Sequence, residues 1–141
     1  MFANFDYSTF PVVLVDLSGT INNDVQFTHF TENWLKLYED QEEFEFIFET
    51  QNISSAFIGP KYCLYVALFI RSLKKRKIQY LKKSKIYVYN KYIFRLLKII
   101  FYIEKPVAPV ELIFIELRNP SFPYDHFLNE NNIIQKEYIN N

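Results

Sequence analysis

Four side chains in this sequence belong to types that often carry catalysis or hold metals. Asp16 lies near the end of the run VVLVDL, and α/β enzymes often place a catalytic carboxylate at the end of a strand. His29 and His126 are the only histidines and lie far apart, and Cys63 is the only cysteine. No motif pairs any of them with a base or a second ligand, so we expect ordinary side chains and a buried structural thiol. We therefore expect no enzyme, cofactor or metal site, with a small enzyme around Asp16 as an open alternative.

Basic residues form a second candidate group. From Lys61 to Lys105 the chain has thirteen basic residues and one acidic residue, whereas the stretch before Gly59 has ten acidic residues and one basic residue. Tyrosines lie among the basic residues, and such a patch can bind phosphate groups or anionic lipid heads. The other interpretation is a solvated surface that the acidic half of the chain balances. The candidate anion-binding patch consists of Lys74, Lys75, Arg76, Lys77, Lys82, Lys83, Lys91, Arg95 and Lys98.

The stretch 44–77 organises the rest of the chain. Phenylalanines alternate with Glu45, Ile47 and Glu49, which predicts a strand over 44–50 with one buried face. Gly59-Pro60 and an apolar stripe predict a helix over 60–76, and its apolar run suggests that this helix is deeply packed. Between the two we predict an exposed loop over 51–59, where a functional site is expected.

The remaining elements follow from similar patterns of alternation, helical spacing and capping. We expect the run VVLVDL to be a central strand covered on both faces. The predicted elements outside 44–77 are a strand over 5–9, a strand over 12–17, a helix from Asn23 or Asp24 to about 39, a strand over 85–89, a helix from 91 to about 104 capped by Asn90, and a strand over 110–117.

Strands that alternate with helices of this length predict βαβ units and an α/β fold. The expected order is β-β-α-β-α-β-α-β, with a mostly parallel sheet of four to five strands and three to four helices. We expect one domain over 1–118, followed by a C-terminal tail or short helix over 119–141.

Composition excludes several classes of function. Half of the residues are apolar and 19% are aromatic, which argues against a disordered chain. Two glycines cannot form a glycine-rich phosphate loop or a dinucleotide fingerprint, and one cysteine cannot form an internal disulfide. The first residues lack the pattern of a signal peptide, and no apolar run reaches the roughly 18 residues of a membrane span. We therefore expect a cytoplasmic protein without a transmembrane segment.

The layout resembles the STAS domain, a family named for sulfate transporters and anti-sigma-factor antagonists. The residues that carry the resemblance are VVLVDLSGTI, FEFIFET with the segment before the central helix, KIYVY, and NKYIFRLLKIIF, within about residues 5–117. The resemblance implies a non-catalytic regulatory module in which a serine before the central helix is phosphorylated by a partner kinase. Here the matching residues are Asn52, Ser54 and Ser55. The preceding Asp of the family pattern is absent, and Ala56 replaces its Gly.

Two binding functions follow from these patterns. The first is a protein-interaction module that binds a partner through residues 51–59 and the face of the 60–76 helix. The alternative is peripheral binding of anionic lipid through the basic residues between 74 and 98. Nucleic acid is the less favoured partner.

Overall fold

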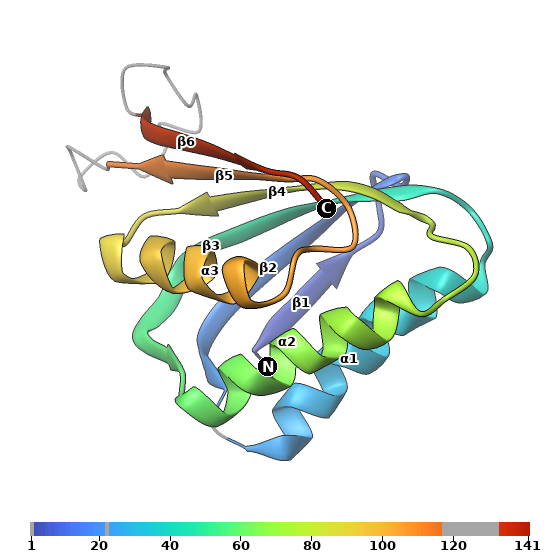
Figure 1. Cartoon of the computed structure of the whole chain (residues 1–141), viewed down its shortest axis with the longest axis horizontal. Coiled ribbons are helices and arrows are strands. Elements are labelled where there is room, and N and C mark those ends of the chain that lie inside the picture. Colours follow the sequence, from blue (N-terminus) through green and yellow to red (C-terminus); the bar gives the residue numbers. More distant parts are fainter. Residues whose placement is uncertain (1, 22, 117–132) are drawn as a thin grey trace.

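The computed structural model describes residues 2–21, 23–116 and 133–141, with the side chains of these residues except 54–58 and 134. Within these residues the chain is an α/β fold with a six-stranded mixed sheet and three helices (Figure 1). The predicted α/β class is therefore confirmed. The elements are, in order, β1 (Ala3–Asp6), β2 (Val12–Ile21), α1 (Asp24–Glu39), β3 (Phe44–Ile58), α2 (Pro60–Lys74), β4 (Leu81–Val88), α3 (Lys91–Ile103), β5 (Val110–Ile115) and β6 (Ile133–Ile139).

The strands lie in the sheet in the same order as in the sequence, from β1 to β6. The four inner strands, β2 to β5, are parallel, and each outer strand pairs antiparallel with its neighbour. The sequence predicts four to five mostly parallel strands, so the sixth strand and the mixed character of the sheet are new. Each outer strand is next to its sheet neighbour in the sequence as well. Antiparallel neighbours of this kind can be joined without a crossover helix.

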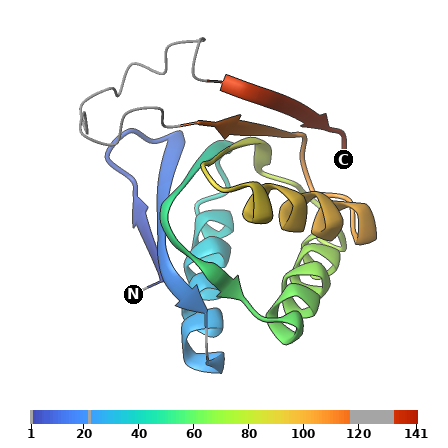
Figure 2. The same cartoon turned by 90° about the vertical axis from the view of Figure 1, so that its left-hand side faces the viewer.

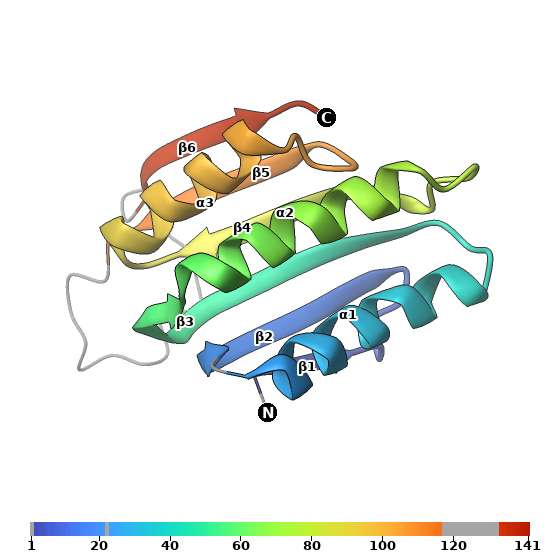
Figure 3. The same ribbon diagram turned by 60° about the horizontal axis from the view of Figure 1, so that its bottom comes forward.

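All three helices lie on one face of the sheet. Each helix connects two neighbouring parallel strands, and right-handed crossovers between strands in sequential order place every helix on the same side. Figure 3 shows α1, α2 and α3 in front of the sheet and running in the same direction. Figure 2 shows the sheet curving around them. No described helix covers the other face of the sheet, which we call the open face.

Burial along β2 follows this one-sided arrangement. Val13 and Val15 are fully buried toward the helices, whereas Leu14 is 38% exposed and Asp16 is exposed on the open face. The expectation that this strand is covered on both faces is therefore wrong. A run of apolar residues is compatible with either arrangement, because Leu14 can stay partly exposed at modest cost on an open sheet face. Gly19, near the end of β2, has a positive φ of 73° beside an irregularity in the pairing with β3.

The starts of two helices follow the predicted capping. Asn23 caps α1, where its side-chain oxygen accepts a hydrogen bond from the Gln26 backbone N–H at 2.9 Å. Asn90 caps α3 and accepts from the N–H groups of Tyr92 and Ile93. Both helices therefore begin where a side chain satisfies backbone donors that have no partner inside the helix.

Aromatic rings fill the space between the sheet and the first two helices. Trp34 of α1 contacts Phe46 of β3 and Phe69 of α2, with ring centroids 4.7 Å and 5.4 Å apart and edge-to-face geometry. Phe44 and Phe46 are each only 1% exposed. The alternating phenylalanines thus lie on the buried face of β3, as the sequence predicts. Such ring pairs add stability beyond the area that they bury.

Two segments that the sequence predicts as a loop and as a tail or short helix contain strands in the structure. Residues 51–58 belong to β3, which continues to Ile58 and leaves only Gly59 before α2, so the predicted loop over 51–59 is wrong. Likewise, residues 133–139 form β6, which pairs with β5 from Ile139 opposite Val110 to Ile133 opposite Ile115. This part of the predicted tail over 119–141 is therefore a strand of the sheet and neither a helix nor a loose end. Residues 117–132 lie outside the described part of the chain.

Candidate functional site

The outward face of α2 combines large apolar and basic side chains. Leu64 and Leu68 lie one helical turn apart and are 55% and 46% exposed. Exposed Lys61, Arg71 and Lys75 continue the same stripe in both directions. The expectation that this helix is deeply packed is therefore wrong for its outer face. Its buried stripe, which includes Ile70 and Leu73, is enough to dock it on the sheet.

The outward face of α3 has the same mixed character. Tyr92 and Ile99 are 54% and 55% exposed, and Ile103 is 61% exposed. Tyr102, at 89%, is among the most exposed aromatic residues described. Basic side chains alternate with these residues along the exposed face, at Lys91, Arg95 and Lys98.

These two faces belong to neighbouring helices (Figure 3). Glu104, at the C-terminal end of α3, joins them, because its carboxylate lies 3.7 Å from Arg71 Nη2 and 3.5 Å from Lys74 Nζ of α2. We call the combined region the α2–α3 surface. It consists of Lys61, Leu64, Leu68, Arg71, Lys75, Lys91, Tyr92, Arg95, Lys98, Ile99, Tyr102 and Ile103.

The charge of the α2–α3 surface is only partly balanced. Lys61 pairs with Asp24 of α1 at 3.3 Å, and Lys98 pairs with Glu137 of β6 at 3.3 Å. Among the residues that the structure describes, no ion pair holds Lys75, Lys91 or Arg95. The surface therefore keeps a positive character around its apolar side chains.

The structure does not bring the nine predicted basic residues into one patch. Lys74–Lys77 lie at the C-terminal end of α2, whereas Lys91 lies at the N-terminal end of α3, at the opposite end of the helix layer (Figure 3). Lys82 and Lys83, in β4, pair with Glu43 and Glu45 at 3.3 Å and 3.7 Å. The acidic first half of the chain thus neutralises part of the basic second half, which sequence alone leaves open.

Arg76 and the two lysines that flank it are at the end of α2. The Arg76 guanidinium lies 5.1 Å from the centre of the Tyr38 ring, a cation–π geometry. Lys75 and Lys77 are exposed. This part of the predicted patch is therefore partly used to hold α1 against the turn after α2.

The predicted phosphorylation residues lie on β3. Asn52 is exposed and pairs in register with Ser18 of β2. The side chains of Ser54 and Ser55 lie outside the described part of the structure. Gly59, the residue before α2, provides no side-chain cap.

The open face holds a pair of neighbouring carboxylates that sequence reasoning misses. Asp16 and Glu49 are register partners on β2 and β3, and the Tyr89 hydroxyl donates a 2.9 Å hydrogen bond to Glu49 Oε2. Burial raises the pKa of the Glu49 carboxyl, and the charge of Asp16 adds to this increase. Burial together with the Glu49 charge raises the pKa of the Tyr89 hydroxyl. Alternation in the sequence already places Glu49 on the face opposite the phenylalanines, but only the strand register brings it beside Asp16.

The other chemically capable residues have ordinary surroundings. His29 lies beside Asn33 one turn along α1, with Asn33 Nδ2 3.1 Å from His29 Nδ1. Burial raises the pKa of the Cys63 thiol, which keeps it protonated and a poor nucleophile. His126 lies outside the described residues. Within 2–21, 23–116 and 133–141, no three His, Cys, Asp or Glu side chains gather around a possible metal position.

Comparisons with protein-family models, with curated proteins and with solved structures give no match. Among the described residues, no helix has the length and hydropathy needed to cross a bilayer.

Proposed function

We propose that this chain is a non-catalytic, STAS-like interaction module that binds a protein partner through the α2–α3 surface. The single observation that carries the proposal is the exposure of Leu64 and Leu68 on α2 and of Ile99, Tyr102 and Ile103 on α3. Large apolar side chains grouped on neighbouring helices are typical of protein-interaction sites. A polar rim around an apolar centre is the usual composition of such a site, and here the rim is basic.

The partner should be acidic where it meets the rim. Lys75 at the end of α2 and Lys91 and Arg95 of α3 are exposed and have no ion pair among the described residues. Complementary charge raises the association rate and selects between partners more than it adds affinity. The apolar side chains would then supply most of the binding free energy.

A double substitution on α2 tests this function. Leu64→Ser with Leu68→Ser removes two exposed apolar side chains and leaves the buried stripe of the helix intact, so the fold should be retained. Affinity capture from the source cells should recover one or more proteins with the wild-type chain and lose them with the variant.

Tyr138→Ser is the matched control. Tyr138 is 67% exposed on β6 and shares its register position with Glu111, away from the helices. This control should capture the same proteins as the wild type. If the double variant also captures them undiminished, the α2–α3 surface is not the binding site.

Anionic lipid is the second candidate, and α3 is the element that favours it. Its exposed face interleaves Lys91, Arg95 and Lys98 with Tyr92, Ile99 and Tyr102. Helices that lie in a membrane interface combine basic residues with aromatic and aliphatic side chains in this way. Each basic residue near an anionic bilayer contributes about 1 kcal/mol.

Vesicle co-sedimentation decides between the two functions. If lipid is the partner, the chain should sediment with phosphatidylserine vesicles at low salt and be released at high salt. Lys91→Gln with Arg95→Gln should then weaken binding, whereas Lys36→Gln with Lys85→Gln, an equal change in charge on α1 and β4, should not. No sedimentation at low salt excludes the lipid function and leaves the protein partner.

A further inference from the structure

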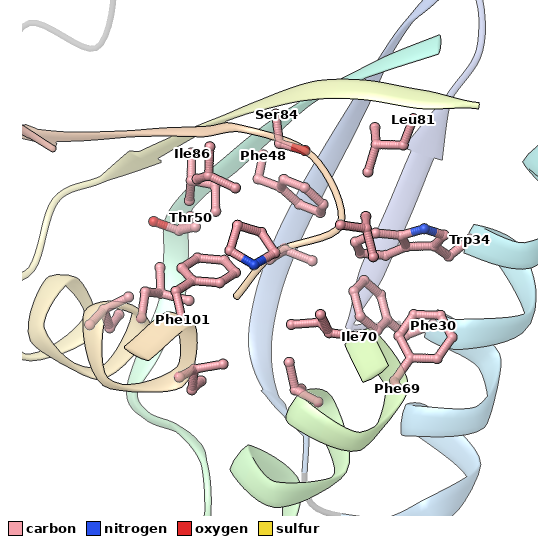
Figure 4. Close-up of a pocket in the computed structure, with 18 of the residues that line it drawn as sticks. Phe30, Trp34, Phe48, Thr50, Phe69, Ile70, Leu81, Ser84, Ile86 and Phe101 are labelled. Atoms are coloured by element: carbon pink, nitrogen blue, oxygen red, sulfur yellow. The ribbon is translucent and has the colours of Figure 1, made fainter. Parts of the chain in front are cut away.

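A cavity of about 110 Å³ lies between the helix layer and the sheet. Figure 4 shows side chains from all three helices and from the sheet around it, with Trp34 on one side and Phe101 on the other. The rings of α1 and α2 pack on β3 through Trp34, Phe46 and Phe69, whereas α3 packs on β5 through Phe94 and Phe114. The cavity is the space that these two packing clusters leave between them.

The cavity wall is almost entirely apolar. No charged side chain lines it, and Thr50 and Ser84 are its hydroxyl-bearing residues. The Thr50 hydroxyl already donates a 2.7 Å hydrogen bond to the Tyr87 carbonyl. Ser84 is only 5% exposed, and within the described residues its hydroxyl has no hydrogen-bond partner. Two polar groups of the lining residues thus have no hydrogen-bond partner among the described residues: the Ser84 hydroxyl and the buried Trp34 indole N–H.

These properties define the ligand. A charged group would lose its hydration without gaining a counter-charge, so the ligand must be neutral. An ordered water needs two to four polar partners, which this wall scarcely offers. A cavity of about 150 Å³ in an unrelated protein takes up benzene, so a volume near this one suits a small ring or a short alkyl chain.

We propose that this cavity binds a small, neutral, apolar molecule that carries one hydrogen-bonding group, which meets the Ser84 hydroxyl. The apolar part lies against Ile70, Leu97 and Phe101, and the helix layer closes over it. This site is separate from the α2–α3 surface, because it lies beneath the helices and not on their outer face.

The single tryptophan provides the measurement. Trp34 lines the cavity and is the only tryptophan of the chain, so its fluorescence reports on the occupant directly. Three probes of similar shape separate the parts of the proposal: cyclopentanol, cyclopentane and cyclopentanecarboxylate. Cyclopentanol should shift the emission with a saturable dose dependence and raise the melting temperature. Cyclopentane should bind more weakly, and cyclopentanecarboxylate at pH 7 should not bind.

Two variants connect binding to the cavity. Ser84→Ala should weaken cyclopentanol binding about fivefold, the usual effect of one hydrogen bond, and leave cyclopentane binding unchanged. Ala108→Leu, which adds volume at a lining position that is 4% exposed, should reduce binding of both probes. If Ala108→Leu fails to fold, comparing cyclopentanol binding to the wild type and to Ser84→Ala still tests the proposal. A response to cyclopentanol that does not saturate, equal binding of the carboxylate, or no effect of Ser84→Ala would overturn the proposal.

Discussion

On the open face, the surroundings of Glu49 change the acidity of its carboxyl group. Burial is the main cause of its raised pKa, and the hydrogen bond from Tyr89 opposes it. The folded state therefore holds the Glu49 proton more tightly than the unfolded state does. The stability that this gives is present below the ordinary pKa of 4.5 and is lost as pH rises through the folded value.

The substitution Glu49→Gln tests whether the ionised Glu49 carboxylate destabilises the folded state. Glutamine cannot ionise and can still accept the Tyr89 hydrogen bond, so the variant should melt at a higher temperature than the wild type at pH 7. The difference should shrink as pH falls to about 4, where the wild-type carboxyl gains its proton. Thermal melts at the two pH values measure this. Glu32→Gln, on the exposed side of α1, should change neither melt. A variant that melts lower at pH 7 would show that the Glu49 charge is stabilising.

At the scale of single residues, the sequence predicts contacts between residues that are close in the sequence. It misses contacts that depend on how two strands pair. Asn23 and Asn90 are recognisable as caps because the groups they bind lie two or three residues further along the chain. Glu49 and Asp16 are 33 positions apart, and only the pairing of β2 with β3 makes them neighbours. The unused hydroxyl of Ser84 depends in the same way on helices that come from distant parts of the sequence.

Helix α3 is the element whose start depends most visibly on one side chain. Asn90 Oδ1 accepts hydrogen bonds at 2.7 Å from Tyr92 N and at 3.4 Å from Ile93 N. Asn90→Ala would leave both donors without this partner, and the loss of such a cap costs about 1 kcal/mol. Urea denaturation should show a lower midpoint with an unchanged slope.

Asn4→Ala is the matched control for this change. Asn4 is exposed on β1, where its side chain caps no helix. This variant should keep the wild-type midpoint. Equal midpoints for Asn90→Ala and the wild type would mean that tertiary packing alone fixes the start of α3.

Among elements, the clearest difference between prediction and structure is the length of β3. Alternating phenylalanines predict the strand over 44–50, but residues 51–58 contain polar and small side chains that are typical of a loop. They are a strand because β2 continues beside them to Ile21, which pairs with Ile58. β6 is missed for the same physical reason, since its ladder with β5 joins segments that are distant in the sequence.

At the scale of the whole molecule, the side of the sheet on which the helices lie determines where a partner can bind. The sequence predicts βαβ units, but the order of the strands decides whether the helices cover one face or both. Here the order is sequential, so the outer faces of α2 and α3 form one side of the molecule and the open face of the sheet forms the other. The stretch of chain that joins β3 to α2 is a single residue, so the exposed loop that is expected from the sequence to share the binding site with the 60–76 helix is absent.

The central claim, that a protein partner binds the α2–α3 surface, is tested most directly by the affinity of a captured partner for two variants. Full burial of a leucine side chain contributes about 1.5–3 kcal/mol, and Leu64 and Leu68 are each about half exposed, at 55% and 46%. Their joint replacement by serine should raise the dissociation constant at least about tenfold. Tyr138→Ser should leave it within about twofold of the wild type, since surface changes away from an interface have small effects. An unchanged affinity of the double variant, or a larger loss with Tyr138→Ser, would contradict the account.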